Sequence, residues 1–177
     1  MILALEGNDG VGKSTAAALL NRKFGLFVFE DPVRHGALGD LDAGGLNQCG
    51  NQCNLDLAAF SRELNFVADR WLLSSYVYDA LRGIPPNREV FEICSKVPAW
   101  IFLLECNCAV ARERVISRDG TPRRTLGEME SIERGFQDAA LLWTQCGGYV
   151  RYLSSESPQF ERELIGAVEI ALLHSGR

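Results

Sequence analysis

The chain contains the run Gly7-Asn8-Asp9-Gly10-Val11-Gly12-Lys13-Ser14, a complete G-x-x-x-x-G-K-[ST] pattern. It follows the apolar residues 2–5, which predict a buried strand, and precedes residues 15–23, which predict a helix. A strand, a glycine-rich turn and a helix N-terminus in this order direct backbone N–H groups toward one point, where they bind polyphosphate. We therefore expect a nucleoside triphosphate site, with Lys13 at the β- and γ-phosphates and Ser14 as a ligand of Mg²⁺.

Strand-like and helix-like segments alternate along the rest of the chain. The expected strands are residues 2–5, 26–29, 64–68, 100–104 and 149–153. The expected helices are residues 15–23, 55–63, 72–81, 88–95, 109–117, 126–145 and 158–173. This alternation predicts an α/β P-loop NTPase fold, with a five-stranded parallel sheet flanked by helices on both faces, in one domain over residues 1–177.

Two segments between these elements have the composition of functional loops. Residues 36–54 are rich in glycine, asparagine and glutamine without strong periodicity, and we expect a loop over the mouth of the site. Residues 118–125 combine turn-forming residues with Arg118, Arg123 and Arg124. A basic loop after a helix predicts a lid over the triphosphate.

Composition excludes some classes of protein and leaves others open. The net charge of −5 argues against a generally basic surface that coats nucleic acid, although a local basic groove is compatible with it. No apolar run reaches the roughly 20 residues of a membrane helix, so we expect a soluble, cytoplasmic protein. The six cysteines lack the spacing of a zinc knuckle; we expect no structural metal, and their role is open.

Three motifs in order resemble those of thymidylate kinases. The run from Glu6 to Thr15 resembles E-G-x-D-G-x-G-K-S-T, including the aspartate inside the loop. Residues 69–78, Asp-Arg-Trp-Leu-Leu-Ser-Ser-Tyr-Val-Tyr, follow D-R-Y-x-x-S-x-x-A-Y. The segment from Pro98 to the basic lid, followed by a long helix and a last strand, extends the resemblance over nearly the whole chain.

The resemblance implies a role for each matched position, with ATP as donor, Mg²⁺ as cofactor and a homodimer as assembly. Asp9 would orient the acceptor, and Arg70 would bind the acceptor phosphate or the transferring group. The implied catalytic residues are Asp9, Lys13, Arg70, Arg118 and Arg123, with Arg124 competing for the lid role. The implied nucleotide-binding residues are Gly7, Asn8, Asp9, Gly10, Val11, Gly12, Lys13, Ser14 and Thr15, and the metal ligands are Ser14 and Asp69.

The acceptor side departs from the family. Thymidylate kinases carry a base-reading helix before the D-R-Y element, and here we expect it to be reduced to residues 55–63, with Phe60 and Arg62 as its aromatic and basic residues. Arg34 is the candidate for the acceptor phosphate, with His35 a weaker one. The expected acceptor-binding residues are therefore Arg34, Phe60, Arg62, Asp69, Arg70 and Tyr78.

Three functions fit these motifs. One is a thymidylate kinase that converts dTMP to dTDP. Another is the related bacteriophage type of kinase, acting in the host cytoplasm on 5-hydroxymethyluracil within DNA as a step in thymine hypermodification. We favour this DNA-base kinase at the level of sequence, because a reduced helix would leave the cleft open to a flipped base. The third is a nucleotide-binding switch, for which no N-K-x-D string is present.

Overall fold

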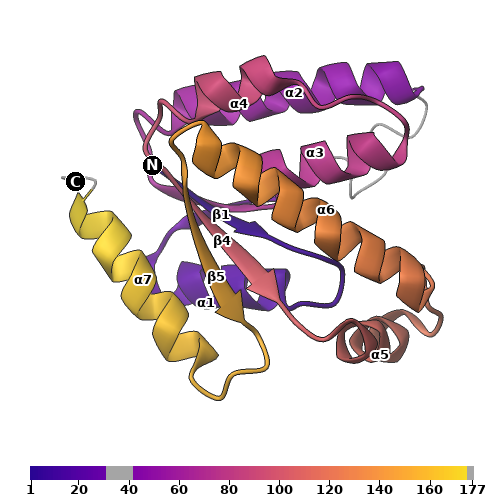
Figure 1. Ribbon diagram of the computed structural model, residues 1–177. Helices are drawn as coiled ribbons and strands as arrows, with labels where there is room; N and C mark the ends of the chain where they lie inside the picture. The colour runs from indigo at the N-terminus through magenta and orange to yellow at the C-terminus, as the bar shows by residue number, and fades with distance from the viewer. Residues whose placement is uncertain (31–41, 175–177) are drawn as a thin grey trace.

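A five-stranded sheet lies at the centre of the computed structural model, which describes residues 1–30 and 42–174 (Figure 1). Its strands are β1 (Ile2–Glu6), β2 (Phe27–Glu30), β3 (Phe66–Asp69), β4 (Ala99–Glu105) and β5 (Tyr149–Ser154). Their order is β2-β3-β1-β4-β5, and every pairing is parallel. The predicted five-stranded parallel sheet is confirmed.

Helices cover both faces of this sheet. They are α1 (Lys13–Phe24), α2 (Ala43–Phe60), α3 (Leu72–Leu81), α4 (Arg88–Cys94), α5 (Cys108–Asp119), α6 (Leu126–Gln145) and α7 (Phe160–His174). Figure 1 shows α2, α3, α4 and α6 on one side of the strands, with α1 and α7 on the other. Since parallel strands need crossover connections, this two-sided cover is what the alternating sequence pattern predicts.

The central strand β1 separates two apolar cores. Ile2 and Ala4 face the core formed with α2, α3, α4 and α6, whereas Leu3 and Leu5 face the core formed with α1, α5 and α7. All four side chains are completely buried. A strand buried on both faces explains why residues 2–5 form a continuous apolar run in place of an alternating one.

Helix α2 corrects the prediction for residues 36–54. Residues 36–41 lie outside the described part of the chain, but from Ala43 onward the segment is helix, so the expected loop and the reduced helix at 55–63 were wrong. Glycine and asparagine have low helix propensity, which hid the helix. It forms because the side chain of Asp42 caps it, accepting a hydrogen bond from Gly45 N (2.7 Å), and because it packs on α3 and α4.

The strand order also places the functional segments side by side. Strand β3 pairs with β1 in a register that sets Asp69 beside Leu5, although 64 positions separate them in the sequence. The loop after β1 and the turn after β3 therefore leave the sheet next to each other. In open α/β sheets ligands bind at this carboxyl edge.

Candidate active site

The loop between β1 and α1, residues 7–12, is called the phosphate loop below. Its shape is fixed by close packing on β4 and by hydrogen bonds of the Asn8 side chain. Gly7 has φ 130° and packs so closely on β4 that a Cβ there would lie 2.4 Å from Leu104 O. The side chain of Asn8 donates to Met129 O (2.7 Å) and accepts from Asp9 N (2.8 Å). These contacts fix a curved loop at the N-terminus of α1, which is the arrangement that binds anionic phosphates.

Lys13 lies along this loop as the first residue of α1. Its Nζ donates to Gly7 O (2.8 Å) and Asn8 O (2.6 Å), and its side chain is buried. Burial, reinforced by the nearby charge of Arg70, lowers the pKa of Lys13 to about 7. A bound polyphosphate would bring the negative charge that this buried ammonium group needs.

Ser14 and Asp69, the two metal ligands expected from the sequence, are in contact. Ser14 Oγ donates to Asp69 Oδ2 at 2.8 Å. No cluster of three or more His, Cys, Asp or Glu residues able to hold a metal is found within residues 1–30 and 42–174. One hydroxyl and one carboxylate fit Mg²⁺, which is bound through one or two protein oxygens together with phosphates and water.

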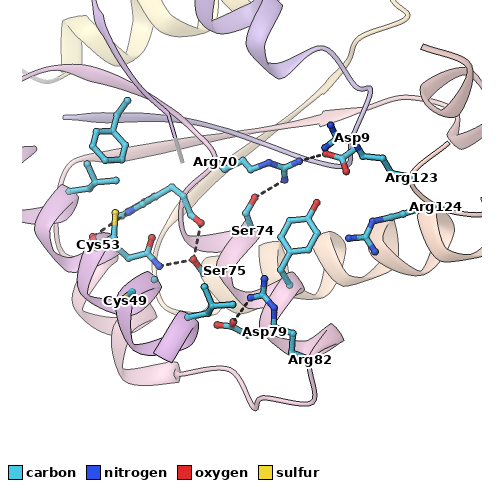
Figure 2. A pocket seen from close by; sticks show the side chains of 17 residues that line it. Asp9, Cys49, Cys53, Arg70, Ser74, Ser75, Asp79, Arg82, Arg123 and Arg124 are labelled. Atoms are coloured by element: carbon cyan, nitrogen blue, oxygen red, sulfur yellow. Dashed lines mark hydrogen bonds and ion pairs between the residues drawn. The ribbon is translucent and has the colours of Figure 1, made fainter. Parts of the chain in front are cut away.

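Arg70 bridges the phosphate loop and the turn after β3. Its Nη2 lies 2.5 Å from Asp9 Oδ1, and its Nη1 donates to Ser74 Oγ at 3.2 Å (Figure 2). Burial alone would raise the pKa of Asp9, but the charges of Arg70 and Lys13 outweigh it and hold that pKa below its ordinary value. Asp9 is therefore an ionised carboxylate at the edge of the loop.

A cavity of about 310 Å³ opens beside this ion pair, between the phosphate loop and the helices α2 and α3. Its described lining residues are Asp9, Phe29, Leu46, Cys49, Gly50, Cys53, Asn54, Leu57, Arg70, Trp71, Ser74, Ser75, Tyr78, Asp79, Arg82, Arg123 and Arg124. The volume is at the lower end of the range of small-molecule sites, about 300 to 1,000 Å³. It suits one base with its sugar.

The end of the cavity away from the phosphate loop carries paired polar groups. Asn54 Nδ2 donates to Ser75 Oγ (3.0 Å), and Asp79 accepts from Arg82 Nη1 (3.3 Å) and from Asn47 Nδ2 (2.7 Å). Figure 2 shows Ser75, Asp79 and Arg82 along one side of the cavity, with Cys49 and Cys53 facing them from α2. Amide, hydroxyl and carboxylate groups beside apolar side chains can orient a heterocyclic ligand.

The predicted lid arginines differ in position. Arg118 pairs with its neighbour Asp119 at 2.6 Å and does not line the cavity. Arg123 pairs with Asp119 at 3.0 Å and lines the cavity, and the guanidinium of Arg124 lies 5.7 Å from the ring centre of Tyr78. Of the three, Arg123 and Arg124 are therefore placed to act on a ligand in the cavity.

Several predicted acceptor residues are brought together and others are not. Arg70 and Tyr78 line the cavity, with the guanidinium of Arg70 5.2 Å from the ring centre of Tyr78. Phe60 is 58% exposed, and neither Phe60 nor Arg62 lines the cavity, because Phe60 is the last residue of α2 and Arg62 follows the end of that helix. Arg34 and His35 lie outside the described residues.

Sequence reasoning missed the wall contributed by the first half of α2. Leu46, Gly50, Cys53 and Leu57 line the cavity at spacings of three and four, the periodicity of one helix face. That spacing was the available signal, but only two of these residues are strongly apolar. Arg114, which donates to Gly10 O (3.4 Å) and Ser155 Oγ (3.2 Å), was also missed as a brace of the phosphate loop.

Comparison with solved structures finds similar folds along the whole chain. The YorR protein from Bacillus subtilis in complex with phosphorylated GDP gives a TM-score of 0.73 at 16% identity, covering 100% of this chain and 99% of that chain. Deoxyadenosine kinase from M. mycoides with the products dCMP and dCDP gives a TM-score of 0.62 at 17% identity, covering 98% and 100%. The same kinase with bound dATP gives 0.59 at 17%, covering 94% and 98%.

This chain has the P-loop nucleoside kinase fold. At such low identity the likeness shows the fold alone. No protein-family model and no curated protein matches the sequence. Within the described residues, no helix is long and apolar enough to cross a membrane.

Proposed function

We propose that this protein is an ATP-dependent kinase that phosphorylates a free pyrimidine deoxynucleoside monophosphate, with dTMP as the acceptor that its motifs favour. The observation that carries this proposal is the charged cavity beside the phosphate loop. Among its described lining residues four are arginines and two are aspartates, so the lining has an excess of positive charge. Such a lining suits an acceptor that carries a phosphate group.

The geometry supports transfer between two bound nucleotides. An oxygen of the acceptor phosphate would attack the γ-phosphorus of the donor, forming one P–O bond while the bond to the β-γ bridging oxygen breaks. Negative charge spreads over the equatorial oxygens, and we expect Lys13 beside the loop, with Arg70 and Arg124 in the cavity lining, to stabilise it. Asp9, ionised beside Arg70, holds that guanidinium at the boundary between the two sites.

Mg²⁺ fits this proposal as a partner of the donor. Ser14 and Asp69 would hold it, and it would neutralise charge on the β- and γ-phosphates. The chain's own groups then bind and orient both nucleotides.

The structure removes the main reason for which the sequence favoured 5-hydroxymethyluracil within DNA as the acceptor. That preference rested on a reduced helix and an open cleft, whereas α2 runs from Ala43 to Phe60 and walls the cavity. With a net charge of −5, the whole chain does not have the basic character expected of a DNA-binding surface. A free nucleotide is therefore the better acceptor.

Acceptor-dependent ATP consumption tests the proposal. We expect dTMP and dUMP to stimulate ADP release at least tenfold more than thymidine at equal concentration, since only the monophosphates engage the arginines. Arg124→Ala should raise the KM for dTMP about tenfold or more, because a hydrogen bond to a charged group contributes about 1.5–3 kcal/mol. Arg88→Ala, an exposed arginine paired with Glu92 on α4, is the matched control and should leave this KM unchanged.

The other outcomes identify the alternatives. Faster phosphorylation of thymidine than of dTMP would contradict the proposal and indicate a nucleoside kinase. ATP hydrolysis that no acceptor stimulates would favour the nucleotide-binding switch.

A further inference from the structure

Glu6 is a wholly buried carboxylate at the end of β1, directly before the phosphate loop. Its Oε1 accepts hydrogen bonds from Trp71 N (2.9 Å) and Leu73 N (3.0 Å), and its Oε2 accepts from Ser74 Oγ (2.5 Å). Burial of an ionised carboxylate costs several kcal/mol unless its oxygens are hydrogen-bonded. Here the three donors come from one place, the start of α3.

Glu6 takes the place of a local cap for α3. The N-cap residue of this helix is Trp71, which provides no side-chain acceptor for the first backbone N–H groups. A carboxylate from β1 satisfies two of these groups and lies at the positive end of the helix dipole. The start of α3 is therefore fixed to the central strand of the sheet.

The residue before this helix start is strained. Arg70 has φ 77°, the one positive φ of a non-glycine residue within residues 1–30 and 42–174. A residue in this region costs roughly 1–3 kcal/mol, and it persists where the surroundings hold it. Arg70 N donates to Leu5 O (3.1 Å) and the next amide, Trp71 N, donates to Glu6, so β1 holds the turn at two successive positions.

Side-chain hydrogen bonds connect Glu6 further, to the phosphate loop. Ser74 Oγ donates to Glu6 and accepts from Arg70 Nη1, and Arg70 Nη2 pairs with Asp9 (Figure 2). Glu6, Ser74, Arg70 and Asp9 thus form one chain of hydrogen bonds. It links the buried end of β1 to the edge of the acceptor cavity.

We infer that Glu6 is a positioning residue for phosphoryl transfer, which holds the strained turn at Arg70 and the hydroxyl of Ser74 so that the guanidinium stays between the two nucleotide sites. The inference rests on the proposed function for its catalytic part. Its structural part, the hold of Glu6 on the start of α3, can be measured without any activity.

Glu6→Gln is the main test, because it keeps the size of the side chain but replaces the acceptor Oε2 with an NH₂ group that faces Ser74 Oγ. We expect kcat to fall at least tenfold while the KM for ATP stays within twofold, since the phosphate loop is intact. Glu105→Gln is the matched control: Glu105 ends the adjacent strand β4 and accepts from Gln137 (2.6 Å). It should leave kcat within twofold of the original enzyme.

A double variant tests whether Glu6 and Ser74 act through the same chain. Ser74→Ala should lower kcat in the same direction, and Glu6→Gln combined with Ser74→Ala should be no worse than the more damaging single change. Multiplied effects of the two changes would overturn the inference.

Amide hydrogen exchange separates positioning from folding and from the proposed function. Trp71 N–H and Leu73 N–H should exchange at least tenfold faster in Glu6→Ala than in Glu105→Ala, with amides of α7 unaffected, because alanine removes the oxygen that accepts from both amides. Unchanged exchange at these two amides, or a uniform loss of protection along the chain, would overturn the inference. If the original protein phosphorylates no monophosphate, the proposed function fails, and the exchange result still decides whether Glu6 holds this turn.

Discussion

If Lys13 binds a triphosphate as we propose, the affinity should depend on pH. In the free protein burial lowers the pKa of Lys13 to about 7, from an ordinary value of 10.5. A bound triphosphate would raise that pKa again, so the complex binds more protons than the free protein above pH 7. Affinity should therefore fall as pH rises above 7, by up to about tenfold per pH unit.

Calorimetry in buffers of different ionisation enthalpy measures this proton uptake directly. We expect uptake approaching one proton per ATP bound at pH 8, where the phosphates of ATP are already ionised, and uptake near zero from Lys13 at pH 6. Lys23→Ala, a change at an exposed lysine in the last turn of the same helix, should behave like the original protein. Tight binding at pH 8 without proton uptake would show that Lys13 is already charged in the free protein.

Helix α2 forms one wall of the cavity that we propose binds the acceptor, and its glycines offer a test of that role. Gly50 lines the cavity, and a Cβ added there would meet Ser75 Oγ at an ordinary contact distance of 3.8 Å. Gly50→Ala should raise the free energy of unfolding by about 0.5–1 kcal/mol through helix propensity. It should also raise the KM for the acceptor, because the methyl group lies beside the bound ligand.

Gly166→Ala in α7 is the matched control for this prediction. A Cβ at Gly166 has no atom within 4 Å among those described, and the position is remote from the cavity lining. It should give a similar gain in stability, measured by urea denaturation, with no change in KM. Equal KM values for Gly50→Ala and the original protein would argue against α2 as the wall of the acceptor site.

Local signals explain which elements the sequence predicts well. The predicted bounds of α3 and α6 agree with the structure. The N-cap residue of α6, Thr125, forms a capping box with Glu128, a pattern that is visible in the sequence. The first half of α2 is rich in residues of low helix propensity, and it is helical because it packs on neighbouring helices, so its sequence does not predict a helix. The error at α2 carried over to Phe60 and Arg62, which were placed in the site only because the helix was thought to be short.

Among the long-range contacts within the site, some could be predicted from the sequence and others could not. The meeting of Ser14 and Asp69 could be predicted, because parallel strands end at one edge of the sheet. The contact between Glu6 and the start of α3 depends on the register of β1 against β3 and on the strained turn at Arg70. Neither the register nor that backbone angle is encoded in a local pattern.

At the scale of the molecule, the sheet separates two cores that should contribute independently to stability. Ile132 on α6 belongs to the core with α2, α3 and α4, and Leu164 on α7 belongs to the core with α1 and α5. Ile132→Val should cost about 0.5–1.5 kcal/mol and Leu164→Ala about 2–5 kcal/mol, since both side chains are buried.

The double variant shows whether the cores are independent. Urea denaturation should give a summed cost within about 0.5 kcal/mol of the two single costs, because the residues share no partners. A larger deviation would mean that the two faces of the sheet are coupled in the folded state.

The location of a transferred label shows whether the cavity beside the phosphate loop accepts a free nucleoside monophosphate. The protein is incubated with γ-³²P-ATP, dTMP and DNA carrying 5-hydroxymethyluracil in one mixture, and the products are separated. We predict label in dTDP and none in DNA, and we predict that Lys13→Ala leaves dTDP unlabelled as well. Label in the DNA with no labelled dTDP would contradict the account and restore the DNA-base kinase.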